Sequence, residues 1–293
     1  MINETTKKTL ETLKTQAKKI RLIATDLDGT LLNKRHQLSE INRASLAACV
    51  KKGIVICTAT GRARTSIPNY IVDIPGMKYL ITANGARIYD SLTGDVICES
   101  FLSKEAIEYV RPFLTDKEVL CEFFWDGSAH VDEKLYKSVG ELGIPISFNE
   151  YFIATRIPTP DFAAVVKENE HKIENVNFVF ATESIKNRIG EFLRRREDLY
   201  ELTTSLPFNF EIGGKGVSKA TAVEYILTLE GISKEESIAF GDNTNDTAML
   251  KYAAIGVAPS NGVPEVLSIA DYITDDNDND GFTKALQILG IID

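Results

Sequence analysis

Residues 20–31, with the sequence IRLIATDLDGTL, contain the stretch that decides the fold. A short apolar run ends abruptly in Asp26 and Asp28, and Gly29 follows them. A continuous apolar run bounded by a turn signal is typical of a strand buried on both faces, as in a parallel sheet. One of two carboxylates placed so closely can attack a phosphorus centre and the other can transfer protons, provided that a cation reduces their repulsion. The alternative is a turn that is acidic by chance.

Four further apolar runs, which begin at residues 54, 79, 237 and 254, also end in polar residues. The intervening segments indicate helices and hence parallel βαβ units; Ser39–Val50, with Ser39 as a possible N-cap, is one of them. In a parallel sheet these strand ends meet at one edge, where open α/β sheets bind their ligands. The polar residues that we expect at this edge are Asp26, Asp28, Thr58, Thr60, Asn84, Asp242, Asn245, Asp246 and Asn261.

A different pattern interrupts the parallel units between about Arg87 and Leu206. Hairpin-like turns at 90–95 and 125–128 indicate antiparallel strands. We therefore predict an α/β fold, with a doubly wound parallel sheet as a Rossmann-like core and an inserted α+β cap domain. The expected divisions are an N-terminal helical extension at 1–19, a core domain at 20–86 and 207–293, and a cap domain at 87–206.

The first nineteen residues predict an amphipathic, lysine-rich helix. Its thin apolar side lacks Trp and Phe, which argues against a helix lying on a membrane surface. We expect it to pack on its own domain or on a neighbouring subunit. The apolar positions on one side of this helix are Leu10, Leu13, Ala17 and Ile20.

Composition and sequence patterns argue against several classes of protein. The chain has 293 residues and a net charge of -9, which argues against a generally basic surface for nucleic acid. No apolar stretch approaches the roughly 20 residues that span a membrane, and no secretory signal is visible. The four cysteines form no CxxC pair, so a reducing, cytoplasmic location fits best. The oligomeric state is left open.

The expected edge combines carboxylates with one cation. Asp26, Asp28 and Asp242 require a compensating charge, and oxygen ligands suit Mg²⁺. Lys219 supplies a cation, and Thr60 supplies a hydroxyl at an expected helix start, where backbone N–H groups favour anions. An acidic pocket that holds a dication and a lysine has the outline of a phosphoryl-transfer site.

Four motifs resemble those of the haloacid dehalogenase superfamily: DLDGTL at 26–31, TGR at 60–62, GVSK at 216–219 and GDNTND at 241–246. The long insert between the second and third motifs is similar to that of the Cof-like phosphatases, which carry a type IIB cap. The sequence departs from the family pattern in its N-terminal helix, and in the sequence APSNG at 258–262.

The resemblance implies a Mg²⁺-dependent phosphatase that hydrolyses a small phosphorylated metabolite, such as a sugar phosphate or a phosphorylated cofactor. Asp26 would form an aspartyl-phosphate. Asp28 would transfer protons and contact Mg²⁺ through its backbone carbonyl. The expected site residues are catalytic Asp26, Asp28, Thr60 and Lys219; metal-binding Asp26, Asp28 and Asp242; substrate-binding Gly61, Arg62, Asn84 and Asn245; and supporting Asp246.

Two other functions compete with this hypothesis. A phosphomutase would return the phosphoryl group to a sugar. A metabolite-binding regulator could retain the fold without turnover, although binding alone does not need a paired nucleophile and acid.

Three local patterns also have alternatives. Residues 276–281 match half of a Ca²⁺ loop, but Gln287 stands where a bidentate Glu is required, which favours an acidic surface loop. Arg62 could bind substrate phosphate or pair with an acid. Trp125, Asp126 and His130 lie on one expected hairpin, which could face the substrate or simply be packed.

Overall fold

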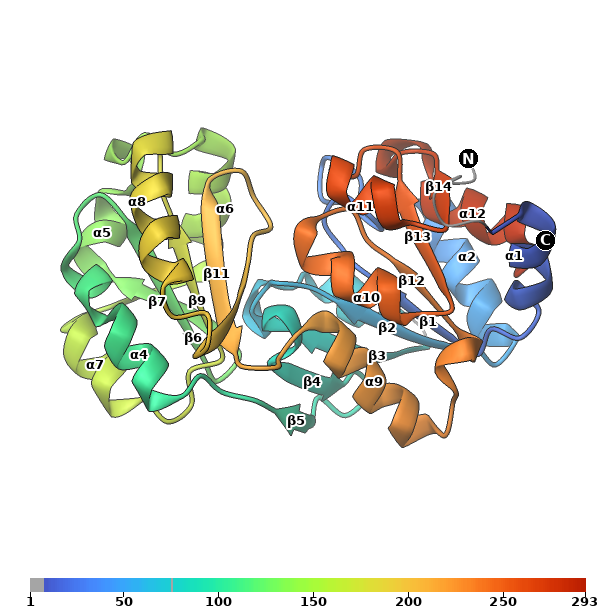
Figure 1. Cartoon of the computed structure of the whole chain (residues 1–293), viewed down its shortest axis with the longest axis horizontal. Coiled ribbons are helices and arrows are strands. Elements are labelled where there is room, and N and C mark those ends of the chain that lie inside the picture. Colours follow the sequence, from blue (N-terminus) through green and yellow to red (C-terminus); the bar gives the residue numbers. More distant parts are fainter. Residues whose placement is uncertain (1–7, 75) are drawn as a thin grey trace.

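The large sheet contains the strand expected at the DxD motif. A computed structural model describes residues 8–74 and 76–293. Within that part of the chain, eight strands pair in the order β14-β13-β12-β1-β2-β3-β4-β5 (Figure 1). The pairs from β14 to β3 are parallel, and those from β3 to β5 are antiparallel. The strands are β1 (Leu22–Thr25), β2 (Val55–Ala59), β3 (Met77–Thr82), β4 (Arg87–Asp90), β5 (Val96–Glu99), β12 (Ser237–Phe240), β13 (Ile255–Pro259) and β14 (Tyr272–Thr274).

Helices cover both faces of this sheet, which confirms the doubly wound α/β core. Successive residues of a strand point to opposite faces. Accordingly, Ile23 packs in the apolar cluster that includes α1, α2 and α12, whereas Leu22 and Ala24 pack in the cluster on the side of α9, α10 and α11. These helices are α1 (Leu10–Ala17), α2 (Glu40–Lys51), α9 (Lys219–Glu230), α10 (Thr247–Tyr252), α11 (Pro264–Ile269) and α12 (Gly281–Leu289).

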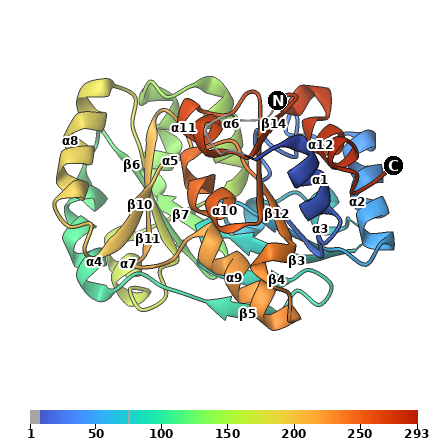
Figure 2. The same ribbon diagram turned by 45° about the vertical axis from the view of Figure 1, so that its right-hand side comes forward.

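A second sheet forms the cap. Its six described strands pair in the order β10-β11-β9-β6-β7-β8. Figure 2 shows α4 and α8 on the outer side of this sheet and α6 between the sheet and the core helices. The strands are β6 (Leu120–Trp125), β7 (Ser128–Asp132), β8 (Arg156–Thr159), β9 (Asn175–Val179), β10 (Tyr200–Thr203) and β11 (Asn209–Gly214); the helices are α4 (Lys104–Val110), α5 (Glu133–Lys137), α6 (Ile146–Thr155), α7 (Phe162–Glu168) and α8 (Glu183–Arg194).

Strand pairing differs from the expected division at both ends of the cap. The β4–β5 hairpin pairs with β3 and extends the core sheet, although residue 87 was expected to begin the cap. Strand β11 pairs with β9 and β10 in the cap sheet, although residue 207 was expected to begin the return to the core. A hairpin pattern reveals the local pairing but not which sheet the hairpin joins. We propose boundaries near residues 100 and 214.

The segment after the TGR motif is less regular than a single helix. It forms a 3₁₀ turn at Arg64–Ser66 and then the four-residue helix α3 (Asn69–Val72). Ile67 lies between them with an extended backbone and precedes Pro68. Proline disfavours the helical conformation in the residue before it, which explains the interruption.

The described part of the N-terminal extension packs on its own domain, which was one of the two arrangements expected from the sequence. Helix α1 contacts α12, and both Leu13 and Ala17 are buried there. Lys8 adds an ion pair with Asp271, at 2.7 Å between Nζ and Oδ2. No helix in the described ranges is long and apolar enough to cross a membrane.

We expect Leu13→Ala to lower the free energy of unfolding by about 2–4 kcal/mol, because the truncated side chain leaves a cavity in the core. Leu13 has no exposed surface, whereas Leu10 is only partly buried. Leu10→Ala is therefore the matched control and should cost clearly less. Urea unfolding of the two variants measures the difference, and equal losses would contradict the placement of this helix.

Candidate active site

Asp26 lies at the C-terminal end of β1, at the predicted edge of the core sheet. Its backbone N–H donates to Phe240 O on the neighbouring strand β12, at 2.9 Å. Its side chain is buried, with 6% of the residue exposed. The parallel sheet thus fixes the backbone that presents this carboxylate, and β12 leads directly into the GDNTND loop beside it.

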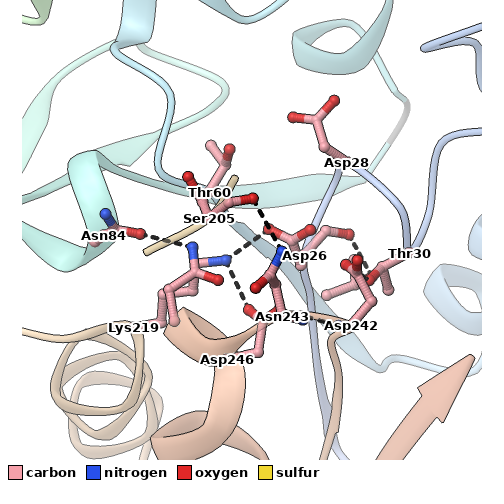
Figure 3. A network of polar contacts seen from close by, with 12 residues as sticks. Asp26, Asp28, Thr30, Thr60, Asn84, Ser205, Lys219, Asp242, Asn243 and Asp246 are labelled. Atoms are coloured by element: carbon pink, nitrogen blue, oxygen red, sulfur yellow. Dashed lines mark hydrogen bonds and ion pairs between the residues drawn. The ribbon is translucent and has the colours of Figure 1, made fainter. Parts of the chain in front are cut away.

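Lys219 reaches this carboxylate from α9. Its Nζ lies 2.6 Å from Asp26 Oδ1 and 2.7 Å from Asp246 Oδ1 (Figure 3). Ser218 caps the helix at this point. Burial alone would lower the pKa of Lys219. The negative charges of Asp246 and Asp26 raise it by more, so the pKa of Lys219 lies above its ordinary value. Lys219 is therefore held as a cation between two carboxylates.

Hydrogen bonds order the GDNTND loop. Asp246 Oδ2 accepts the backbone N–H groups of Asp242 and Asn243, both at 3.0 Å. Thr30 Oγ1 donates to Asp242 Oδ1 at 2.7 Å, which ties this loop to the DxD loop. Gly29 has a φ of 81°, and any side chain there would overlap the Asp242 carboxylate. This position therefore requires glycine both for its conformation and for its space.

The acidic cluster fits a divalent cation. Carboxylate oxygens of Asp26, Asp242 and Asp246 all lie within 4.8 Å of one another. Burial raises the pKa of Asp26 well above its ordinary value despite Lys219, and burial together with Asp246 raises the pKa of Asp242 to about 7. Three carboxylates against one lysine leave an excess of negative charge, and oxygen donors suit Mg²⁺. Both oxygens of Asp246 already have partners, so Asp26 and Asp242 are the better placed ligands.

Asp28 does not join this cluster with its carboxylate. Figure 3 shows its side chain pointing away from Asp26. Arg62 binds it through two contacts, Nε to Oδ2 at 2.7 Å and Nη2 to Oδ1 at 2.6 Å, and His36 Nδ1 lies 2.9 Å from Oδ1. Burial raises the pKa of Asp28, but the His36 hydrogen bond and the Arg62 guanidinium outweigh it and hold that pKa well below its ordinary value. In this arrangement Asp28 is ionised.

The remaining predicted residues surround the cluster. Thr60, Gly61, Arg62 and Asn245 line the cavity above Asp26. Asn84 lies beside it, and its Oδ1 accepts a hydrogen bond from Asn245 Nδ2 at 3.0 Å. All ten candidate residues are therefore brought to one edge of the sheet, from positions throughout the chain, although the carboxylate of Asp28 turns aside.

The cap supplies the other wall of this cavity, which has a volume of about 340 Å³. The Arg62 guanidinium lies 5.1 Å from the Tyr151 ring, and Arg156 lies 4.8 Å from the same ring. Glu122 binds Arg156 at 2.8 and 3.0 Å, so this buried cation is neutralised. The cap residues that line the cavity are Phe124, Pro145, Phe148, Tyr151, Arg156, Asn177, Ser205, Leu206, Phe208, Asn209 and Glu211.

Comparison with known proteins assigns the family. The sequence profile of the haloacid dehalogenase-like hydrolases matches residues 23–286. This chain belongs to that family. It is 30% identical over 268 residues to the 5-amino-6-(5-phospho-D-ribitylamino)uracil phosphatase YcsE of Bacillus subtilis, covering 92% of this chain and 95% of the relative. The putative phosphatase YxeH of the same organism is 28% identical over 272 residues, covering 92% and 98%.

Solved structures of haloacid dehalogenase-like hydrolases share the fold. One from B. subtilis has a TM-score of 0.78 and 26% identity, covering 92% of this chain and 99% of that one. The subclass IIB sugar phosphatase BT4131 also has a TM-score of 0.78, with 27% identity, covering 93% and 100%. The motifs, fold and relatives together identify this hydrolase as a phosphatase, which confirms the predicted enzyme class.

Several residues of this hydrolase site had no sequence signal. His36 has a φ of 56° and reaches Asp28 from a loop that no motif marks. Glu211 is buried beside Asn84 and accepts its amide N–H, but it lies on a strand of the cap sheet. Tyr151 and Arg156 are only five residues apart, because β8 begins directly after α6, but no motif marks either residue. No spacing rule would have found the contacts of His36 and Glu211.

The hairpin residues singled out from the sequence do not line the cavity beside Asp26. Trp125 stacks on His130, with ring centroids 3.6 Å apart. Asp126 Oδ2 pairs with Lys172 Nζ at 2.5 Å. The structure therefore supports the packed interpretation of this hairpin.

The acidic loop at 276–281 lies apart from the carboxylate cluster. Asp278 pairs with Lys34 at 3.0 Å, and Asp280 accepts a hydrogen bond from Ser39 at 2.5 Å. Asn261 connects this loop to the site, because it donates to Gly29 O and accepts from Asn277 N. Within the described ranges, the loop contributes no carboxylate to a possible metal group.

Proposed function

We propose that this hydrolase is a Mg²⁺-dependent phosphatase that acts through an aspartyl-phosphate on Asp26. The observation that carries the proposal is the buried Asp26 carboxylate, which lines a cavity between core and cap and lies 2.6 Å from Lys219. A carboxylate so placed can attack a phosphoryl group, while the lysine opposes the charge on that group.

The substrate that we propose is a small phosphorylated metabolite, a sugar phosphate or a phosphorylated cofactor. One relative is named for a phosphorylated ribitylaminouracil, and one structural neighbour is named as a sugar phosphatase. Both names describe phosphate monoesters. The cavity of about 340 Å³ is near the lower end of the range for small-molecule sites, which favours a compact leaving group.

The residues divide the work as follows. An oxygen of Asp26 attacks phosphorus, the bond to the leaving oxygen breaks, and Asp28 gives that oxygen a proton. Lys219 and Thr60 hold the transferring group. Asp28 then takes a proton from water as the water attacks phosphorus, which releases phosphate and restores Asp26. Asp26 and Asp242 would hold Mg²⁺, which neutralises charge on the phosphoryl oxygens.

The position of Asp28 adds a requirement to this scheme. Its two contacts with Arg62 keep the carboxylate ionised and turned from Asp26. A general acid must be protonated and within reach of the leaving oxygen. We therefore propose that substrate binding draws Arg62 away from Asp28. Because Arg62 also contacts the cap residue Tyr151, this change of partner would depend on the position of the cap.

The test is turnover of p-nitrophenyl phosphate with Mg²⁺, followed by product analysis on a panel of metabolite phosphates. We expect inorganic phosphate and the free alcohol. Transfer of phosphate to a second position on a sugar would instead indicate a phosphomutase. Binding of the panel without turnover would support the regulator hypothesis.

Removal of the metal should have two effects that can be measured separately. EDTA should abolish turnover, and excess Mg²⁺ should restore it. Because the ion relieves repulsion in the folded cluster, Mg²⁺ at a hundredfold excess over its Kd should add about 2.7 kcal/mol to the free energy of unfolding. Asp242→Asn is the control and should lose most of this gain. An equal gain in that variant would place the ion elsewhere.

A further inference from the structure

The turn that follows β3 supports the TGR loop of the active site. Its residues Ala83, Asn84 and Gly85 have φ values of 48°, 57° and 109°, and this region is unfavourable for residues that carry a Cβ. The backbone N–H of Ala83 donates to Arg62 O at 3.0 Å. The backbone N–H of Asn84 donates to Thr60 O, also at 3.0 Å. The conformation of this turn therefore determines where the TGR loop lies.

The same turn touches two other parts of the site. Asn84 Oδ1 accepts a hydrogen bond from Asn245 Nδ2 in the GDNTND loop, at 3.0 Å. A Cβ on Gly85 would lie 2.2 Å from Ser218 O, so the turn packs directly against the N-cap of α9, the helix that carries Lys219. A backbone in an unfavourable conformation persists only where the surrounding contacts fix it. The turn therefore keeps its shape only while these contacts are in place.

One contact of this turn comes from the cap. Glu211 on β11 is 5% exposed and lines the substrate cavity, and its Oε2 accepts a hydrogen bond from Asn84 Nδ2. A Cβ on Gly61 would lie 3.3 Å from this Oε2, so the carboxylate also packs against the TGR loop. Glu211 Oε1 accepts hydrogen bonds within the cap, from Ser205 Oγ at 2.6 Å and Asn209 Nδ2 at 2.8 Å. A single side chain thus connects the cap sheet to the turn that supports the TGR loop.

The donors around Glu211 require a carboxylate at this position. Burial raises the pKa of Glu211 above its ordinary value, although the hydrogen bonds to its oxygens lower it. A glutamine has one acceptor oxygen, so its N–H₂ would face a donor in either orientation, the amide of Asn84 or that of Asn209. Asn84 cannot turn round, because Asn245 holds its Oδ1. Asn209 cannot turn round either, because its Oδ1 accepts the Ser205 N–H at 3.1 Å. The link between cap and core therefore depends on the charge of the side chain and not on its shape alone.

We propose that Glu211 is a positioning residue that couples the closed position of the cap to the TGR loop. The inference rests on the proposed function, in which Thr60 holds the transferring phosphoryl group. With the cap in place, Glu211 fixes the Asn84 side chain and thereby the turn. When the cap moves away, the turn loses this contact and no longer holds the TGR loop in the same position. The phosphoryl site is then complete only when the cap covers the cavity, which restricts turnover to the closed state.

Glu211→Gln tests the coupling. Calorimetry with potassium phosphate and Mg²⁺ should show a Kd raised about tenfold, the change that one hydrogen bond to a charged group can produce, and kcat should fall by a similar factor. The loss of kcat should be equal for p-nitrophenyl phosphate and for the best metabolite phosphate of the panel, because the TGR loop holds the group common to both. Glu230→Gln is the matched control and should keep wild-type values, since Glu230 binds Lys78 and Tyr79 at the far end of α9.

Reversing the polarity of the contact should restore it. Asn84→Asp alone places a second carboxylate against Glu211, so it should weaken phosphate binding at least as much as Glu211→Gln does. Aspartate tolerates the positive φ of this position. In the double variant Glu211→Gln/Asn84→Asp, the new amide can donate to the new carboxylate while its oxygen accepts from the cap donors. Phosphate affinity and kcat should therefore recover at least about fivefold relative to Asn84→Asp, a departure from additivity that reports the direct contact.

Three outcomes would overturn this role and leave the phosphatase assignment intact. If Glu211→Gln lowers only the stability to urea and changes neither Kd nor kcat, the residue is merely structural. Unequal losses of kcat for the two substrates would place Glu211 on the leaving group instead. The third outcome is a double variant that recovers nothing. Failure of the wild type to hydrolyse any phosphate monoester would count against the proposed function alone, because calorimetric binding of phosphate still reports the coupling.

Discussion

Asp26→Asn should abolish phosphatase turnover and leave the chain folded. The amide keeps the shape of the side chain but cannot form the acyl-phosphate, so kcat/KM for p-nitrophenyl phosphate should fall by at least about 10⁴-fold, a loss typical of removing a nucleophile. The fold should tolerate the change, because Lys219 retains Asp246 as a partner at 2.7 Å. Burial disfavours the ionised form of Asp26 and so raises its pKa. The substitution replaces this buried carboxylate with a neutral amide, which the fold should also tolerate.

A second buried aspartate provides the matched control for this variant. Asp271 is 8% exposed, pairs with Lys8 and accepts the Gly256 N–H at 3.0 Å. Asp271→Asn should therefore lower the free energy of unfolding by about 1–3 kcal/mol and leave turnover near that of the wild type. Rates and urea unfolding of both variants give the comparison. Near-normal turnover by Asp26→Asn would refute its assignment as the nucleophile.

The sequence was informative about the core site because backbone topology alone positions it. Asp26 and the GDNTND loop follow neighbouring parallel strands, so their meeting depends only on β1 pairing with β12. An apolar run that ends in acids reveals such a strand and its orientation. The same argument accounts for Thr60 and Asn84, which follow β2 and β3.

The cap and the orientation of Asp28 could not be predicted in the same way. Strand β11 has the apolar character of a core strand, and only its pairing with β9 shows that it belongs to the cap. The partner of Asp28 is set by competition between the cluster, Arg62 and His36 for one carboxylate. Sequence spacing contains no information about which of these contacts is the more favourable in free energy.

Lys219→Met should both inactivate and destabilise the enzyme. Lys219 is 1% exposed, and its removal leaves the Asp26 and Asp246 carboxylates buried without their cation. Breaking a buried pair in this way costs about 3–5 kcal/mol of unfolding free energy. In EDTA the full loss should appear, whereas Mg²⁺ should recover part of it because the ion compensates the same carboxylates. Turnover should fall about 10²–10³-fold even with Mg²⁺, since a cation on the phosphoryl group is missing.

The double variant Lys219→Met/Asp246→Asn separates the structural role from the catalytic one. Removing the second charge should restore about 1–3 kcal/mol of the stability that Lys219→Met loses, because fewer unpaired buried charges remain. Turnover should stay low in the double variant, since Asp246→Asn supplies no cation for the phosphoryl group. Urea unfolding of the four proteins in EDTA gives the coupling energy. Additive losses would show that Lys219 and Asp246 do not stabilise each other, and the ion pair at 2.7 Å would then not contribute to the fold.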